Sequence, residues 1–183
     1  MSKRPSEAAF GRALRDVDLS MYVYRPPDPK SGEGVSNWKP CDFMAWHKTA
    51  DAVHMSWSAA GKIEGVDAAV IAVSTWFECK DTDAVDRFPF ADIRPSQLAG
   101  IRDAARMGIP YWLAIWWRRH SSWTISNAIK LLEWRHEQET LPHRRPAGPT
   151  SVERTLLMSR FGTQSNQTQL TSNLKAVLLG EVD

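Results

Sequence analysis

Two strand-like runs separated by a helical pattern constrain the fold most strongly. The run from Val70 to Cys79 is rich in β-branched and aromatic residues, and the run from Ile109 to Trp117 is almost continuously apolar, which is typical of strands buried in a sheet. Between them, residues 95–107 place apolar side chains at helical spacing and end before Gly108, a residue that favours helix ends. A buried strand that follows directly on a helix packs beside it. The pattern predicts an α/β fold in which a mixed central β-sheet is flanked by α-helices.

Shorter patterns predict the remaining elements of the first 141 residues. Apolar residues three or four positions apart favour helices, and short runs of aromatic and aliphatic residues favour strands. Segments rich in Pro, Gly or acidic residues favour irregular connections. The predicted helices cover residues 7–15 and 123–137, the predicted strands 41–46 and 54–59, and the irregular connections 25–38 and 81–93.

A change of composition follows Leu141. The sequence His-Arg-Arg-Pro-Ala-Gly-Pro indicates a linker, and helices are expected around residues 152–158 and 174–179. We therefore expect one domain over residues 1–141 and a linker with a C-terminal tail over 142–183. The tail is predicted to be either a helical docking arm or partly disordered.

The amino-acid composition limits the classes of protein to which the chain can belong. Among 183 residues, 43% are hydrophobic and 24% are charged, which is ordinary for a globular domain. No apolar run approaches the roughly 20 residues that span a bilayer, and the N-terminus lacks the apolar stretch of a signal peptide. We expect a cytoplasmic protein without a membrane partner, in which Cys41 and Cys79 are buried, reduced thiols.

Charge is distributed unevenly along the chain. Residues 31–93 contain five Lys or Arg against ten Asp or Glu, whereas residues 94–145 contain nine against four. An acidic segment followed by a basic one suits a site that holds a cation beside a polyanion such as DNA. Arg102 and Arg106 would share one face of the predicted helix. The arginines expected to contact phosphates are Arg94, Arg102, Arg106, Arg118 and Arg119.

Three charged residues could together form a hydrolytic centre. Glu78 and Lys80 end the apolar strand on one face, because side chains alternate along a strand, and Asp42 opens an earlier strand. Two carboxylates supply the oxygen ligands that a hard divalent cation prefers. A lysine beside them could position an attacking water or stabilise charge on a phosphate. The backbone carbonyl of Cys79 is a further candidate ligand.

These residues resemble the signature of PD-(D/E)xK nucleases, with Pro40-Cys41-Asp42 followed by Glu78-Cys79-Lys80. The downstream segment from Phe88 to Leu98, Phe-Pro-Phe-Ala-Asp-Ile-Arg-Pro-Ser-Gln-Leu, is similar to the equivalent part of bacterial Holliday junction resolvases of the RecU type. The resemblance covers residues 5–120 and implies a restriction-endonuclease-like sheet.

The resemblance also implies residue roles. Asp42 and Glu78 would be metal ligands, Lys80 would be catalytic, and Gln97 would assist near the site. Glu7 would occupy the acidic position of the first helix, where the helix dipole also favours a carboxylate. Two departures stand out. The stretch between Asp42 and Glu78 is longer than in compact family members, so a further hairpin is expected around residues 54–65 and Asp67 is an alternative to Asp42. Cys41 also replaces a small hydroxyl residue.

Together these features predict a Mg²⁺-dependent DNA endonuclease, with Mn²⁺ as a substitute, that hydrolyses phosphodiester bonds in branched DNA. The family and the symmetry of a four-way junction imply a homodimer. One alternative is a restriction-type or repair nuclease acting on duplex, flap or single-stranded DNA. A second is a non-catalytic DNA-binding protein on a nuclease scaffold, and a third is a structural protein whose tryptophans form an oligomer interface.

Overall fold

A six-stranded sheet forms the centre of the computed structural model, which describes residues 5–17, 21–26, 41–48, 72–141 and 149–182. Only β3 and β5 run parallel, and every other neighbouring pair is antiparallel. In spatial order the strands are β1 (Tyr22–Tyr24), β2 (Phe43–Lys48), β3 (Ala72–Thr82), β5 (Tyr111–Trp117), β6 (Ser122–Asn127) and β8 (Gly162–Asn166).

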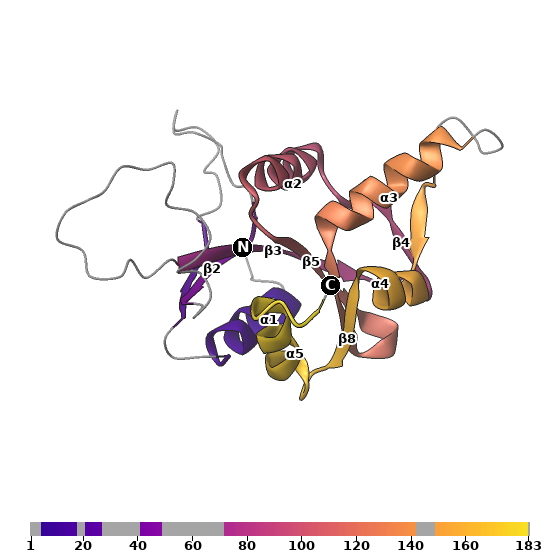
Figure 1. Cartoon of the computed structure of the whole chain (residues 1–183). Helices are drawn as coiled ribbons and strands as arrows, with labels where there is room; N and C mark the ends of the chain where they lie inside the picture. Colours follow the sequence, from indigo (N-terminus) through magenta and orange to yellow (C-terminus); the bar gives the residue numbers. More distant parts are fainter. Residues whose placement is uncertain (1–4, 18–20, 27–40, 49–71, 142–148, 183) are drawn as a thin grey trace, which may run out of the picture.

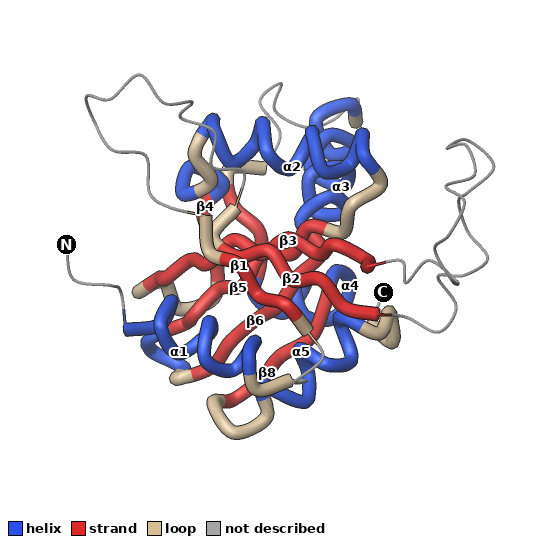
Figure 2. Tube along the Cα trace, turned by 90° about the vertical axis from the view of Figure 1, so that its left-hand side faces the viewer, coloured by secondary structure: helices blue, strands red, loops and turns tan. Residues whose placement is uncertain are grey.

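Helices cover both faces of this sheet (Figure 1). One core packs α2 (Pro95–Met107), α3 (Ala128–Thr140) and α4 (Arg154–Phe161) against the sheet side chains that include Trp76, Leu113 and Trp117. The other packs α1 (Pro5–Arg15) and α5 (Leu170–Leu178) against Phe77, Trp112 and Trp123. Figure 2 shows α2 and α3 on the side of the sheet opposite α1 and α5. The predicted α/β architecture, a mixed sheet flanked by helices, is confirmed.

The connection from β3 to β5 carries the predicted helix. Pro95 is the first residue of α2, where a proline's missing N–H costs nothing, and Gly108 ends the helix with φ 67°, a left-handed conformation that glycine adopts without strain. The parallel pairing of β3 with β5 then requires this kind of long crossover. The sequence therefore predicted the β3–α2–β5 unit correctly.

The segment 81–93 is more regular than its composition predicted. Asp81 and Thr82 extend β3, and Phe88 belongs to β4 (Arg87–Pro89), which pairs with β7 (Ser151–Glu153) in a second, two-stranded sheet. A 3₁₀ turn follows over Phe90–Asp92. Phe88 is fully buried, so burial of apolar side chains orders a segment that its charged residues suggested would be irregular.

The predicted helix over residues 123–137 is wrong in its first part, because β6 occupies Ser122–Asn127. Trp123 and Ile125 pack towards α1 and α5, while Thr124 on the opposite face accepts a hydrogen bond from Trp117 Nε1 at 2.7 Å. This alternation has the period of a strand. Asn127 then caps α3 by accepting from the N–H groups of Ile129 and Lys130, both at 3.1 Å, and so starts the helix several residues later than predicted.

Residues 149–182 are built into the sheet and its cores, where the sequence had suggested an appended tail. The predicted tail helices correspond to α4 and α5, and β8 lies in the polar stretch between them. β8 approaches β6 so closely that a Cβ on Gly162 would lie 1.8 Å from the carbonyl oxygen of Ile125. Only glycine fits at that position.

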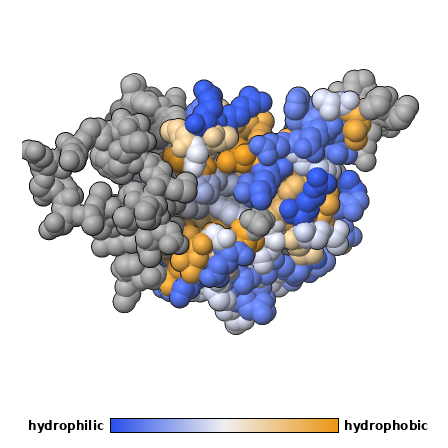
Figure 3. Space-filling model, viewed as in Figure 1, coloured by the Kyte–Doolittle hydropathy of each residue, from blue (hydrophilic) through white to orange (hydrophobic). Residues whose placement is uncertain are grey.

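Several expectations fall outside the described residues. These are the strand at residues 54–59, the hairpin around 54–65, the alternative ligand Asp67, and most of the loop 25–38. Within the described ranges, no helix has the length and apolarity required to cross a membrane. On the face shown in Figure 3, hydrophilic residues cover the outer parts of α2 and α3, and apolar residues appear in separate patches.

Candidate active site

Glu78 and Lys80 project from the same face of β3 and are both buried. Their exposures are only 4% and 8%, and Lys80 Nζ lies 3.4 Å from Glu78 Oε1. The two residues on either side of Lys80, Cys79 and Asp81, face α1 by the alternation of the strand. Burial of a charged pair in a sheet carries a large desolvation cost, so the structure keeps these two polar groups where packing alone would favour apolar ones.

Asp42 is brought beside Glu78 by backbone pairing. The N–H of Asp42 donates to the carbonyl of Phe77 at 3.0 Å, and the N–H of Cys79 donates to Asp42 Oδ2 at 2.9 Å. The register pairs Phe43 with Phe77, so Asp42 and Glu78 are opposite each other across β2 and β3. The structure thus unites the two carboxylates predicted as metal ligands, although 35 residues separate them in the chain.

Gln97, in the first turn of α2, connects Lys80 to Glu78. Its Oε1 accepts from Lys80 Nζ at 2.6 Å and from the N–H of Arg94 at 2.8 Å. Because both partners are donors, they fix the orientation of the amide. The remaining Nε2 group donates to Glu78 Oε1. One side chain therefore closes the first turn of α2 and holds the glutamate and the lysine in position.

The electrostatic environment of Glu78 is strongly unfavourable for its negative charge. Burial is the largest cause, and the nearby carboxylate of Asp42 adds to it; together they raise the pKa of Glu78 to about 8 despite the opposing effect of Lys80. Two acidic groups held in contact in a dry environment repel each other when ionised. A divalent cation between them would remove this penalty.

The donor set suits a small, hard cation that keeps part of its water. Asp42 and Glu78 provide carboxylate oxygens, and the backbone of Cys79 lies between them in the hydrogen-bonding pattern. Across the ranges that the structure describes, no group of three or more His, Cys, Asp or Glu could hold a metal ion. Mg²⁺ commonly uses one or two carboxylates and several waters, so these residues fit Mg²⁺ better than they fit a cation that needs a full protein cage.

Tyr111 is a site residue that the sequence analysis missed. It begins β5, is fully buried, and packs edge-on against Trp76 with ring centroids 6.3 Å apart. Burial, then the charges of Glu78 and nearby acidic groups including Asp42, raise its pKa well above the usual range. Its place in an apolar run gave no signal in the sequence, because proximity to Glu78 depends on the pairing of β3 with β5.

Glu7 lies on α1 and is bound to Arg25. Arg25 Nε donates to Glu7 Oε1 at 2.9 Å, and a second guanidinium nitrogen bonds to the same oxygen. Glu7 is close enough to Cys79 to contribute, after burial, Asp42 and Glu78, to the raised pKa of that thiol. The start of α1 is tied to β3 by a bond from Ser6 Oγ to Asp81 Oδ2 at 3.0 Å. Glu7 is thus near the carboxylates, with an arginine as its bound partner.

The five predicted phosphate-binding arginines differ in their surroundings. Arg118 bonds to Asp81 Oδ1 at 2.7 Å and to Asp83 Oδ2 at 2.8 Å, and these bonds raise its pKa. Arg106 pairs with Asp103 at 2.8 Å in the same helix. The bonds of Arg118 to Asp81 and Asp83 therefore hold the end of β3 in place. All five arginines are exposed to solvent, Arg94, Arg102 and Arg119 included.

Both cysteines are buried, reduced thiols, as predicted. Cys41 Sγ bonds to the carbonyl oxygen of Phe43 at 3.2 Å, so the thiol is directed to the backbone at the start of β2. Cys79 packs in the core with α1. Each cysteine flanks a proposed ligand in the sequence.

Comparison with known proteins gives similarities to solved structures alone. No family model matches the chain, and no curated protein matches its sequence. Among solved structures, the chain is similar to Hjc, a Holliday junction resolvase from the archaeal hyperthermophile Archaeoglobus fulgidus, at 13% sequence identity and a TM-score of 0.43. That similarity covers 83% of this chain and 88% of Hjc. The function is therefore inferred from the geometry of the site itself.

Proposed function

We propose that this chain is a metal-dependent endonuclease of the PD-(D/E)xK type that hydrolyses phosphodiester bonds in DNA. The observation that carries the proposal is the position of Asp42 opposite the buried Glu78 in the strand register, next to Lys80 and Gln97. Keeping two carboxylates and a lysine together in a packed sheet carries a considerable desolvation cost. Such a cost is typical of a site that performs chemistry.

Each of these side chains would have a different role in hydrolysis. Asp42 and Glu78 would hold Mg²⁺, or Mn²⁺ in its place, with the carbonyl of Cys79 as a third protein ligand. The cation supplies Lewis acidity and lowers the pKa of a bound water. Lys80 orients the attacking water and offsets negative charge that develops on the phosphate. Gln97 fixes both Lys80 and Glu78, so its role is to position them.

Branched DNA is the substrate that we favour, and a four-way junction above all. The exposed arginines Arg94, Arg102 and Arg119 supply positive charge near α2 and after β5, where a DNA backbone could be held. Because a four-way junction presents two equivalent strands, a homodimer would place one active site at each. The RecU-like segment from Phe88 to Leu98 supports this choice of substrate.

An assay of substrates and metals tests the proposal. Purified protein is incubated with four-way junctions, flaps, duplex and single strands, with Mg²⁺, Mn²⁺ or a chelator. Asp42→Asn and Lys80→Ala are compared with Asp92→Asn and Lys130→Ala, which change the same types of side chain at exposed positions. We expect metal-dependent cleavage that only the first pair of substitutions abolishes.

The possible outcomes separate the hypotheses. Cleavage that survives Asp42→Asn or Lys80→Ala would show that the active site is elsewhere. Equal activity on linear duplex and junctions would favour the restriction-type or repair nuclease. Binding of every DNA without cleavage would favour a non-catalytic scaffold, and the absence of both binding and cleavage would favour a structural protein.

A further inference from the structure

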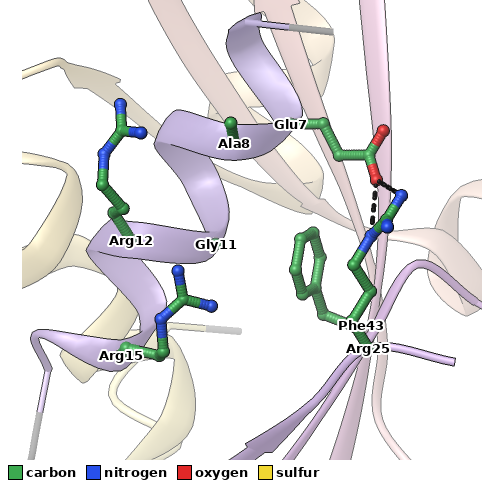
Figure 4. Close-up of a pocket in the computed structure, with 7 residues that line it drawn as sticks. All are labelled: Glu7, Ala8, Gly11, Arg12, Arg15, Arg25 and Phe43. Atoms are coloured by element: carbon green, nitrogen blue, oxygen red, sulfur yellow. Dashed lines mark hydrogen bonds and ion pairs between the residues drawn. The ribbon is translucent and has the colours of Figure 1, made fainter. Parts of the chain in front are cut away.

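A cavity of about 350 Å³ lies against α1, outside the group formed by Asp42, Glu78, Lys80 and Gln97. Three guanidinium groups and one carboxylate line it, so its side chains carry an excess of two positive charges. The lining comes from α1, from the residue after β1 and from the start of β2 (Figure 4). The lining residues are Glu7, Ala8, Gly11, Arg12, Arg15, Arg25 and Phe43.

Gly11 gives this cavity its shape. A Cβ at Gly11 would lie 2.8 Å from Cε1 of Phe43, so the missing side chain lets the Phe43 ring pack directly against α1. Arg15 Nη1 is 3.6 Å from the same position, so the guanidinium of Arg15 folds back over the helix. Figure 4 shows Arg15 extending past Gly11 while Arg25 approaches Glu7 from the strand side. The base is therefore apolar and the rim is cationic.

The cavity lies near the candidate active site in the strand pairing, but on the other face of the sheet. Tyr24 pairs with Met44, and continuation of this register places Arg25 opposite Phe43, one residue from Asp42. Two interstrand spacings, about 10 Å, then separate the backbone of Arg25 from that of Glu78. Glu7 orients Arg25 through two hydrogen bonds. Phe43 packs in the core with α1, whereas Lys80 and Glu78 bond to Gln97 on α2, so the cavity and this pair lie on opposite faces of the sheet near its β1 edge.

We infer that this cavity binds a phosphate group of the DNA substrate away from the phosphate that is cleaved, with Arg15 and Arg25 as the main contacts and Arg12 at the rim. The inference rests on the proposed nuclease function. Guanidinium groups bind phosphate oxygens in a bidentate manner, and the cavity has room for part of one strand but not for a duplex.

The helix dipole offers a simpler explanation for two of these arginines. Arg12 and Arg15 are in the last turn of α1, where positive charge is favourable. The helix dipole accounts for the positive charge of Arg12 and Arg15, but it does not account for the position of Arg25, which lies outside α1. It also makes a different prediction, because a dipole contribution affects stability and leaves DNA affinity unchanged.

Binding measured as a function of salt distinguishes these explanations. Fluorescence anisotropy of a labelled four-way junction is recorded in chelator, so that no cleavage occurs, for the wild type, Arg15→Gln and Arg12→Gln. Arg160→Gln is the control, because Arg160 is exposed on α4 and its loss changes the net charge equally. Loss of one phosphate contact should reduce the slope of log K against log salt by about 0.9.

The expected result is selective. Arg15→Gln weakens binding by about tenfold at 0.1 M salt, as one fewer phosphate contact implies, Arg12→Gln weakens it less, and Arg160→Gln leaves both affinity and slope unchanged. An unchanged affinity and slope for Arg15→Gln, in a wild type that binds and cleaves junctions, would overturn this inference and keep the nuclease. A wild type that binds no DNA would overturn both. Lower thermal stability of Arg15→Gln with an unchanged slope would assign Arg15 to the helix dipole and would also overturn the inference.

Discussion

Replacement of Glu78 by Gln should make the metal-free protein more stable at alkaline pH while it removes cleavage. The pKa of Glu78 is about 8 in the folded protein against 4.5 for an ordinary glutamate. Between these values the unfolded chain has released its proton and the folded protein has not. Stability is therefore full below pH 4.5 and falls as the pH rises, until the folded carboxyl has also ionised above pH 8.

The size of the effect follows from the same shift. Each pH unit in this window costs about 1.4 kcal/mol, so the loss is roughly 3 kcal/mol at pH 7 and approaches about 5 kcal/mol above pH 8. A glutamine resembles the protonated acid in shape and charge and can still accept from Gln97 Nε2. The substitution also preserves the hydrogen bond that Lys80 Nζ donates to Gln97 Oε1 at 2.6 Å. Glu78→Gln should therefore show little of this pH dependence.

Urea denaturation in chelator at pH 5 and at pH 9 measures the difference. We expect wild type and Glu78→Gln to agree within about 1 kcal/mol at pH 5, and the variant to be more stable by roughly 3–5 kcal/mol at pH 9. Added Mg²⁺ should stabilise the wild type alone, because binding to the folded state adds to its stability. Glu181→Gln, at an exposed position, is the control. Equal pH dependence in the wild type and Glu78→Gln would refute the argument.

Substitutions at Gln97 and at Gly162 test the structure more widely. Gln97→Ala removes the link between Lys80 and Glu78 and should reduce kcat by about 10- to 100-fold with little change in KM. Gln97→Glu keeps the acceptor for Lys80 but repels Glu78, and it should move the alkaline limb of the pH–activity profile to higher pH. A loss confined to KM would contradict a positioning role. Gly162→Ala should destabilise the fold by at least ~3 kcal/mol in thermal denaturation, since its Cβ would collide with backbone. The control is Gly180→Ala, which has open space around it and should cost only about 1–2 kcal/mol. Similar losses in the two variants would contradict the close approach of β8 to β6.

The sequence predicted those parts of the molecule that depend on local pattern. β3, α2 and β5 each have a clear periodicity, and the spacing of Glu78 and Lys80 fixed their shared face. The grouping of Asp42 with Glu78 was expected from the chemistry of their carboxylates and from the family resemblance, because strand pairing between distant residues leaves no periodic signal. Tyr111 was missed for the same reason. The roles of these residues in catalysis stay predictions.

Two errors in secondary structure also have physical causes. Ser122–Asn127 alternates between packing on α1 and α5 and packing on the opposite face, yet it continues directly into α3, so a single helical pattern was assigned to both. The polar β8 is held by backbone pairing to β6 and by the contact at Gly162, neither of which its side chains reveal. Tertiary pairing overrides local propensity in both segments.

The position of α5 has a consequence for synthesis of the chain. Leu170 and Leu174 are fully buried in the same core as Phe10 and Leu14, so α1 completes its packing only after the residues of α5 have left the ribosome. Such distant contacts slow folding, because a long loop must close before they form. The helix that carries Glu7 and the arginine-lined cavity is thus anchored late. A nascent chain that lacks α5 would therefore lack the packing that holds Glu7 and the cavity in place.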